Sequence, residues 1–354
     1  MTSTERVMAA VNFRKPDRIP IWDGYWGHFI DSWQRYKGFT GSEDPRNYYG
    51  IDLSICVADE TFFPSQRGVV SDDGDYTIER DGWGRTIRTG KNDAYFMETL
   101  DTVLREPSDL DRLACEPADS EIRFRGFPEY VAAERAAGRC IFAKVGGLYI
   151  RSHFLRGEDK LLLDMALDLG FCDALFDWTI EHLTAMALET LRRTDAWKTG
   201  LWVYDDMANI NSTMFSPAMF ERFLLPRYAK LIDTCRAAGC EHFFLHSDGN
   251  IGPVLDMLLA AGFEGFNPLE PRCGLDLLEL REKYGKRCVF FGGMCNTRIL
   301  PRGDRAEIER FVKPLIELGR EGGLVLGSAS IGDDIAPETY DYYMSLVKRL
   351  GIHP

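Results

Sequence analysis

The sequence predicts a single α/β domain, residues 1–354, built as a (β/α)8 TIM barrel. Eight short runs rich in β-branched and aromatic residues recur along the chain, and helical patterns separate most of them. Alternating β and α units favour a parallel sheet, and eight repeats favour its closure into a barrel. The alternative, an open doubly wound sheet, normally carries a Gly-rich phosphate turn after its first strand, and this chain has none there.

The predicted strands are 19–22, 53–58, 140–145, 201–204, 242–245, 265–269, 289–292 and 324–327. The predicted helices are 158–191 (two helices broken near Gly170), 217–238, 252–261, 275–284, 304–318 and 337–350. Gly262 and Gly285 stop the helices before them, and Asp304 opens a sequence that resembles a capping box. Pro314 is expected to kink its helix.

Residues 66–105 interrupt this rhythm after the second predicted strand. They contain the turn sequences Asp-Asp-Gly-Asp and Asp-Gly-Trp-Gly, and the residues at 76–80 alternate in character. The pattern predicts a β-hairpin insertion of antiparallel strands outside the barrel sheet. Two roles stay open for it: a lid over the barrel mouth, or a contact in a homodimer.

Composition excludes several classes of protein. The 42 Lys and Arg against 55 Asp and Glu give a net charge of −13, which argues against nucleic-acid binding. Hydrophobic residues make up 45% of the chain, too many for a disordered protein, but no apolar run is long enough for a membrane helix. The N-terminus does not resemble a signal peptide, and nine scattered cysteines without a CxxC pair indicate a reduced, cytoplasmic protein.

Active sites of such barrels lie at the carboxyl ends of the strands, so the polar residues that follow each predicted strand are candidates. Asp59 follows the second strand, and the adjacent Asp205 and Asp206 follow the fourth. Because side chains alternate along a strand, only one member of an adjacent pair points inward. An inward carboxyl with a raised pKa suits general acid–base work, so these three residues are the predicted proton-transfer groups.

The end of the fifth predicted strand carries a metal-ligand pattern. Alternation through 242–250 places His246 and Asp248 on one face at the strand tip, so both side chains can converge on one ion. Imidazole and carboxylate are a usual ligand pair for zinc or another divalent metal. The alternative is that Asp248 caps the following helix and His246 is a hydrogen-bonded core residue.

Aromatic residues follow the first two predicted strands and predict a substrate-binding surface. Such side chains near a barrel mouth can stack on a flat ligand, although packing of helices on the barrel would use the same residue types. The predicted substrate-binding residues, with one serine from the eighth strand end, are Trp22, Tyr25, Trp26, Phe63 and Ser330.

Five motifs resemble the uroporphyrinogen decarboxylase superfamily. They are RVMAAVNFRKPDRIP at 6–20, SPAMF at 216–220, HSDGN at 246–250, NPLEP at 267–271 and FGG at 291–293. The resemblance implies a (β/α)8 barrel with one of two chemistries. One is cofactor-free decarboxylation of uroporphyrinogen, and the other is zinc-dependent methyl transfer that involves a corrinoid protein.

Departures from the family patterns favour methyl transfer. The decarboxylases carry an Arg-rich loop after strand one, whereas 22–28 contains no Arg, and Ser-Ala-Ser at 328–330 replaces their Gly-His-Gly; only their essential Asp is matched, by Asp59. The thiol methyltransferases bind zinc through His-x-Cys and a second Cys. Here His246 matches, but Asp248 replaces the Cys. An oxygen-rich site of His246, Asp248 and Glu270, or a strand-four carboxylate, would leave the ion a stronger Lewis acid and suit an ether oxygen.

The resemblance therefore implies a metal-assisted methyltransferase of the O-demethylation type. It would move a methyl group from a small methoxylated or methylamine-type donor to a corrinoid carried by a partner protein. The alternative is a cofactor-free decarboxylase or other lyase.

Overall fold

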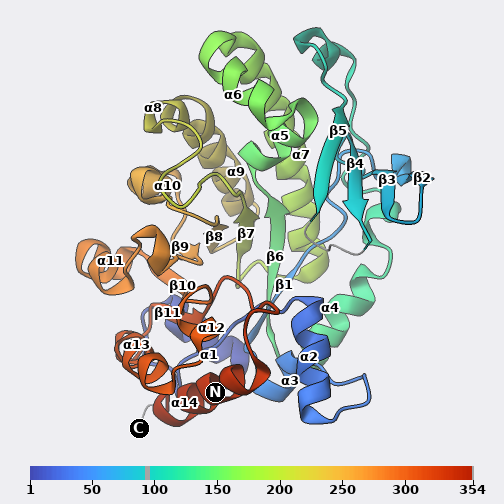
Figure 1. Ribbon diagram of the computed structural model, residues 1–354. Helices are drawn as coiled ribbons and strands as arrows, with labels where there is room; N and C mark the ends of the chain where they lie inside the picture. The colour runs from blue at the N-terminus through green and yellow to red at the C-terminus, as the bar shows by residue number, and fades with distance from the viewer. Residues whose placement is uncertain (92–95, 353–354) are drawn as a thin grey trace.

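The computed structural model describes residues 1–91 and 96–352, and its core is a curled parallel sheet (Figure 1). Seven strands pair in this sheet within those residues, in the spatial order β1-β6-β7-β8-β9-β10-β11. Each coincides with a predicted strand. Their bounds are Leu53–Cys56, Cys140–Gly146, Leu201–Tyr204, Phe243–His246, Gly265–Asn267, Val289–Gly293 and Leu324–Gly327.

The first predicted strand, 19–22, forms bridges instead of a strand of this sheet, which corrects the count of eight. The Trp22 N–H donates to the Leu326 carbonyl at 3.0 Å, and the Asp52 N–H donates to the Ile21 carbonyl at 2.9 Å. This segment therefore bonds both to β11 and to the residue preceding β1. Pro20 has no N–H to donate, so a continuous ladder cannot form there. The arrangement is consistent with the predicted barrel.

Helices lie around the outside of the curled sheet (Figure 1). The break predicted near Gly170 falls at Asp168, whose side chain accepts from the Phe171 N–H and caps α7. Asp304 caps α13 as predicted, and Pro314 lies inside that helix. The bounds are α1 Ser3–Val11, α2 Gly27–Lys37, α3 Pro45–Tyr49, α4 Phe127–Ala136, α5 Leu148–Arg156, α6 Glu158–Leu167, α7 Leu169–Thr194, α8 Pro217–Met219, a π-turn Phe220–Leu224, α9 Leu225–Ala237, α10 Leu255–Ala261, α11 Leu277–Tyr284, α12 Ile299–Arg302, α13 Arg305–Leu318 and α14 Pro337–Leu350.

Large apolar side chains fill the space enclosed by the sheet. Phe142, Trp202, Phe244 and Phe291 belong to one buried cluster, in which α1 also takes part through residues such as Val7. Helix α1 lies at the amino ends of the strands, as its ion pair shows: Arg6 binds Asp52, the residue before β1, at 2.8 Å. The carboxyl ends of the strands are therefore left for a site.

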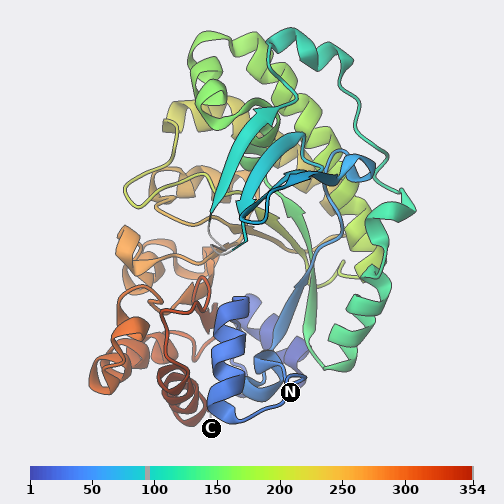
Figure 2. The same cartoon turned by 45° about the vertical axis from the view of Figure 1, so that its right-hand side comes forward.

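The insertion forms antiparallel strands, as predicted, and is larger than one hairpin. Its four strands, β2 Gly68–Asp72, β3 Tyr76–Arg80, β4 Arg85–Gly90 and β5 Met97–Thr102, make a separate sheet (Figure 2). Trp83, in the turn between β3 and β4, packs on this chain's own barrel. The Arg151 guanidinium of α5 lies 3.9 Å from the centre of its ring, and the Phe62 ring lies 5.4 Å away.

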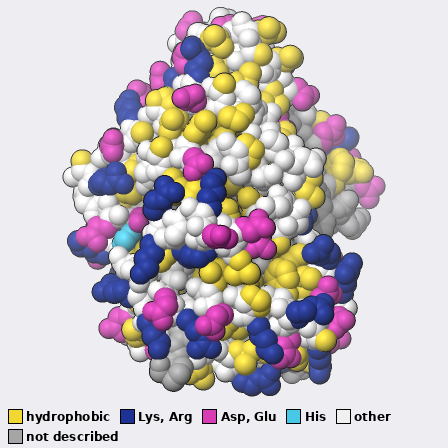
Figure 3. All heavy atoms as spheres, turned by 90° about the vertical axis from the view of Figure 1, so that its left-hand side faces the viewer, with side chains coloured by type: hydrophobic (Ala, Val, Ile, Leu, Met, Phe, Trp, Pro, Cys, Tyr) yellow, Lys and Arg dark blue, Asp and Glu magenta, His cyan; other side chains and the backbone are white. Residues whose placement is uncertain are grey.

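The surface carries charges of both signs, and the cysteines do not form disulfides in this structure. One face of the molecule intersperses acidic and basic side chains (Figure 3). In the described part of the chain, no helix has both the length and the apolar character needed to cross a bilayer. All nine cysteines are unpaired, and eight of them are buried.

Candidate functional site

Three side chains converge at the carboxyl ends of β7 and β8. His246 is the last residue of β8, Asp206 follows β7, and Asp248 lies two residues beyond His246. The His246 Nε2 atom is 3.6 Å from Asp206 Oδ1 and 3.9 Å from Asp248 Oδ1. One ligand atom from each residue lies within 4.8 Å of the other two. His246 and Asp248 thus lie together as predicted, with Asp206, which follows the fourth predicted strand (β7), beside them. We call these three residues the triad.

The imidazole of His246 is held in one orientation and one tautomer. Asn267 Nδ2 donates to the Phe291 carbonyl at 2.9 Å, which turns its Oδ1 toward His246. That Oδ1 lies 2.6 Å from His246 Nδ1, so in the neutral ring Nδ1 carries the proton and Nε2 keeps its lone pair. The Tyr204 ring stacks on the imidazole, with ring centres 4.3 Å apart. Nε2, the nitrogen that faces both carboxylates, is therefore the one able to bind a metal.

The triad fits a divalent ion. Two ligand atoms on a tetrahedral zinc are about 3.3 Å apart, close to the observed separations of 3.6 and 3.9 Å. Burial, and then the neighbouring Asp206 carboxylate, raise the pKa of Asp248, while His246 opposes them. A cation between the carboxylates would relieve this repulsion. Asp206 and Asp248 are 47% and 52% exposed, so the site is open to a further ligand.

Glu270, the other predicted metal ligand, lies outside the triad. Its Oε2 accepts from the Gly249 N–H at 3.0 Å, and its Oε1 lies 2.9 Å from Arg272 Nε. Both oxygens are thus engaged within the protein. Glu270 holds the backbone turn that follows Asp248, and this contact is its role in the arrangement seen here.

Asp205 and Asp206 point in different directions, as predicted for adjacent residues. Asp205 is fully buried and accepts from the Tyr149 and Ile150 N–H groups, at 3.1 and 2.7 Å, at the start of α5. It also accepts from the Tyr228 hydroxyl. Burial raises the pKa of Asp205 to about 6 against these hydrogen bonds. Only Asp206 is brought to His246.

After β1, Glu60 rather than Asp59 meets side chains from the neighbouring strand β6 and helix α5. Asp59 pairs with Arg67 at 3.0 Å and accepts from the Thr61 hydroxyl at 2.6 Å. Glu60 is buried, and Lys144 Nζ lies 2.8 Å from its Oε1. Burial would raise the pKa of Glu60, but the Lys144 and Arg151 cations outweigh it and the pKa is lowered.

The sequence offered one signal for this second cluster. Lys144 is a charged residue inside an otherwise apolar strand, with the small or apolar residues Ala143 and Val145 on either side. Such a residue needs a buried partner. Nothing in the sequence identifies Glu60 as that partner, because the two positions are 84 residues apart.

The predicted substrate-binding residues do not gather at one point. Trp22 packs 5.6 Å from the Trp202 ring in the barrel interior, and the Tyr25 hydroxyl bonds that of Tyr340 at 2.7 Å. Trp26 is 51% exposed at the start of α2. The Ser330 carbonyl accepts from Asn296 at 2.7 Å.

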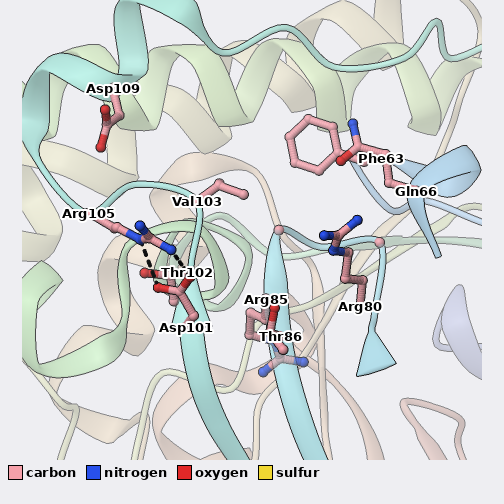
Figure 4. A pocket seen from close by; sticks show the side chains of 12 residues that line it. Phe63, Gln66, Arg80, Arg85, Thr86, Asp101, Thr102, Val103, Arg105 and Asp109 are labelled. Carbon is pink, nitrogen blue, oxygen red and sulfur yellow. Dashed lines mark hydrogen bonds and ion pairs between the residues drawn. The ribbon is translucent and has the colours of Figure 1, made fainter. Parts of the chain in front are cut away.

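Phe63 lines a different cavity, of about 520 Å³, between the insertion and the loop that follows β5 (Figure 4). Arg80 and Arg105 also line it, and Arg105 pairs with Asp101. The triad residues are not among the side chains that line this cavity.

Fold and site together define an α/β protein with a curled parallel sheet and a candidate metal site at the carboxyl ends of its strands. Residues 181–350 match the family model of uroporphyrinogen decarboxylase (URO-D), which supports the predicted resemblance. Among solved structures, a methyltransferase from Methanosarcina mazei is similar with a TM-score of 0.69 and 17% identity, over 99% of both chains. No curated protein sequence matches.

Proposed function

We propose that this chain is a metal-dependent methyltransferase. It takes a methyl group from a small methoxylated or methylamine-type donor and passes it to a corrinoid carried by a partner protein. The observation that carries the proposal is the triad of Asp206, His246 and Asp248, which presents one imidazole nitrogen and two carboxylates within 4.8 Å. The match of residues 181–350 to the URO-D family model, and a fold like that of a methyltransferase, support it.

A divalent ion on the triad would supply Lewis acidity to the donor's ether oxygen or amine nitrogen. Asn267 keeps His246 Nε2 available for that ion, and the half-exposed carboxylates leave room for the donor. When the methyl group leaves an ether, the oxygen keeps the bonding electron pair and takes up a proton. Of the three carboxyls predicted for proton transfer, Asp206 lies beside His246, whereas Asp59 and Asp205 are engaged elsewhere. One Asp206 oxygen would bind the ion, so we assign the proton relay to its other oxygen, because the Asp206 side chain is 47% exposed and open to solvent.

The corrinoid protein would dock at the carboxyl ends of the strands, because the methyl group must travel from the triad to the cobalt. We place the protein in the cytoplasm, where its nine unpaired cysteines stay reduced. The alternative, cofactor-free decarboxylation, has less support, because the Asp59 carboxylate is paired with Arg67 and hydrogen-bonded to Thr61.

Metal content tests the proposal. Protein supplemented with zinc and desalted should retain about one equivalent, and His246→Ala should retain under about a tenth of one. His242→Ala is the matched control. It lies just before the same strand, at its other end, and pairs with Glu264, so it should retain zinc. Zinc occupancy of the unmodified protein should fall as the solution is acidified, because protons compete with the metal for its ligands.

If the unmodified protein kept under about a tenth of an equivalent, the metal-dependent function would be wrong. His246 would then be a hydrogen-bonding residue of the mouth, and the decarboxylase alternative would gain support.

A further inference from the structure

We infer that the barrel mouth has a second, cationic arm at Lys144, and that the methyl donor carries an anionic group, such as a carboxylate, which this arm binds. The inference rests on the proposed function only in that the triad holds the other end of the donor. Lys144, Tyr204 and His246 come from the consecutive strands β6, β7 and β8. The Lys144 Nζ atom lies 5.1 Å from the centre of the Tyr204 ring, and the His246 ring stacks 4.3 Å from it.

The cluster around Lys144 has more positive than negative charge. Lys144 Nζ and Arg151 Nη2 both bind the same Glu60 oxygen, at 2.8 and 2.6 Å, and the other Glu60 oxygen accepts from the Gly146 N–H. One carboxylate therefore balances two cations. Their side chains are 14% and 11% exposed, so water screens the surplus charge poorly.

The neighbouring charges do not remove this surplus once a metal is bound. Asp206 and Asp248 together match a divalent ion, and Glu270 is paired with Arg272. Asp206 is close enough to act on Lys144: burial and the Arg151 cation lower the pKa of Lys144, and Glu60 and Asp206 offset this only in part, so the pKa stays below its usual value. With its carboxylates committed to an ion, the mouth keeps one positive charge in excess, on the Lys144 side.

The spacing suits a donor with one aromatic ring. Neighbouring strands are about 4.8 Å apart, so the backbones of β6 and β8 are roughly 9–10 Å apart across β7. An aromatic carboxylate with a methoxy group on the far side of the ring could place its ether oxygen at the triad and its carboxylate at Lys144. Tyr204 lies between the two arms, in contact with both, and sets their separation. Lys144 Nζ has three donors, of which Glu60 uses one.

Binding of two probes of the same shape tests the inference. We would measure the affinities of 4-methoxybenzoate and the uncharged 4-methoxybenzamide by calorimetry, with the zinc-supplemented protein. The benzoate should bind more tightly, and Lys144→Met should weaken benzoate binding about tenfold while leaving the benzamide unchanged. Lys144→Arg keeps the charge and should restore the preference. Glu60→Gln, which removes the neutralising carboxylate, should preserve or strengthen it.

Equal affinity of the unmodified protein for the two probes would overturn the inference. So would an equal loss of both probes in Lys144→Met, because that result would assign Lys144 a purely structural role. Because the surplus positive charge arises once Asp206 and Asp248 bind an ion, His246→Ala should weaken the preference for benzoate. Zinc content measured on the same samples separates the two claims: equal affinities in zinc-loaded protein overturn the cationic arm and leave the metal site standing, whereas protein that binds no zinc overturns the proposed function.

Discussion

At the scale of single residues, the site depends on Asn267, which contacts His246 Nδ1, the ring nitrogen on the side away from the carboxylates. Asn267 is fully buried, and its amide is fixed by the Phe291 carbonyl. It therefore presents an acceptor to His246 Nδ1 and fixes the tautomer. A histidine without such a partner could rotate, or turn a protonated nitrogen toward the carboxylates. The metal-binding capacity of His246 is thus decided by a residue 21 positions away in the sequence.

Replacing Asn267 should therefore weaken metal binding without removing a ligand. Asn267→Leu deletes the acceptor and should reduce zinc affinity by about 10–100-fold, the usual cost of losing such a partner. Asn267→Asp keeps an acceptor for the Nδ1 proton and should retain most of the affinity. Competition with a chromogenic chelator measures both variants. Equal affinity of the Leu variant and the unmodified protein would show that the Asn267 contact does not position His246.

At the scale of elements, a buried carboxyl joins three segments that are far apart in the sequence. Asp23, after the 19–22 segment, accepts from the backbone and hydroxyl of Ser328, which follows β11, both at 2.7 Å. It also accepts from the Tyr340 hydroxyl of α14 at 2.8 Å. Burial raises the pKa of Asp23 to about 6, against these hydrogen bonds. The folded protein therefore holds this proton more tightly than the unfolded chain does.

This difference makes the contribution of Asp23 to stability depend on pH. Because the pKa is higher in the folded state, the contribution is fully present below about pH 4 and is lost as the pH rises to about 6. Asp23→Asn stays uncharged. Its amide oxygen can still accept from Ser328, and its N–H can donate to Tyr340, which can donate onward to Tyr25.

The Asn variant should therefore be more stable than the unmodified protein at pH 8, by on the order of 2–3 kcal/mol, and equally stable near pH 4. Urea unfolding at the two pH values measures the difference. A variant that is less stable at pH 8 would show that the Asp23 carboxylate is better accommodated than its burial implies.

The insertion, also at this scale, is tied to the barrel by its β3–β4 turn. Trp83 stacks on Arg151, and Arg151 binds Glu60. Gly84 has a φ of +92°, and a Cβ there would lie 2.9 Å from Val103. The turn therefore needs glycine for both conformation and space. Through these contacts the insertion packs next to the cluster of Lys144, Glu60 and Arg151. The two roles predicted for it, a lid over the barrel mouth or a contact in a homodimer, both stay predictions.

At the scale of the whole molecule, the 19–22 segment joins the two edges of the parallel sheet. The contact with β11 is close: a Cβ on Gly327 would lie 1.7 Å from the Trp22 carbonyl oxygen. No side chain at position 327 can be accommodated unless this segment moves away from the sheet. The Ser328–Asp23 contacts follow directly, so such a movement would also disturb the carboxyl ends of the strands.

Gly327→Ala should therefore destabilise the protein by about 3 kcal/mol or more. Gly27→Ala is the matched control. It lies at the start of α2 with no atom within 4 Å of the added Cβ, so it should be neutral or stabilise by about 0.5–1 kcal/mol. Thermal and urea unfolding measure both. Similar stability of the two variants would mean that the 19–22 segment is not held tightly against β11.

The sequence by itself determined the features that depend on residues close together in the chain. The seven parallel strands follow from apolar runs bounded by turn residues, and the capped starts of α7 and α13 follow from Asp168 and Asp304. His246 and Asp248 share a face because a strand repeats every two residues. Asp206, the strand-four carboxylate predicted as the alternative to Glu270, lies beside them, and Glu60 rather than Asp59 contacts Lys144, because only the tertiary structure decides which of several strand-end carboxylates meet. The aromatic residues after the first two strands were divided between core, surface and a second cavity for the same reason: packing across the barrel depends on residues far apart in the chain, and local periodicity carries no information about them.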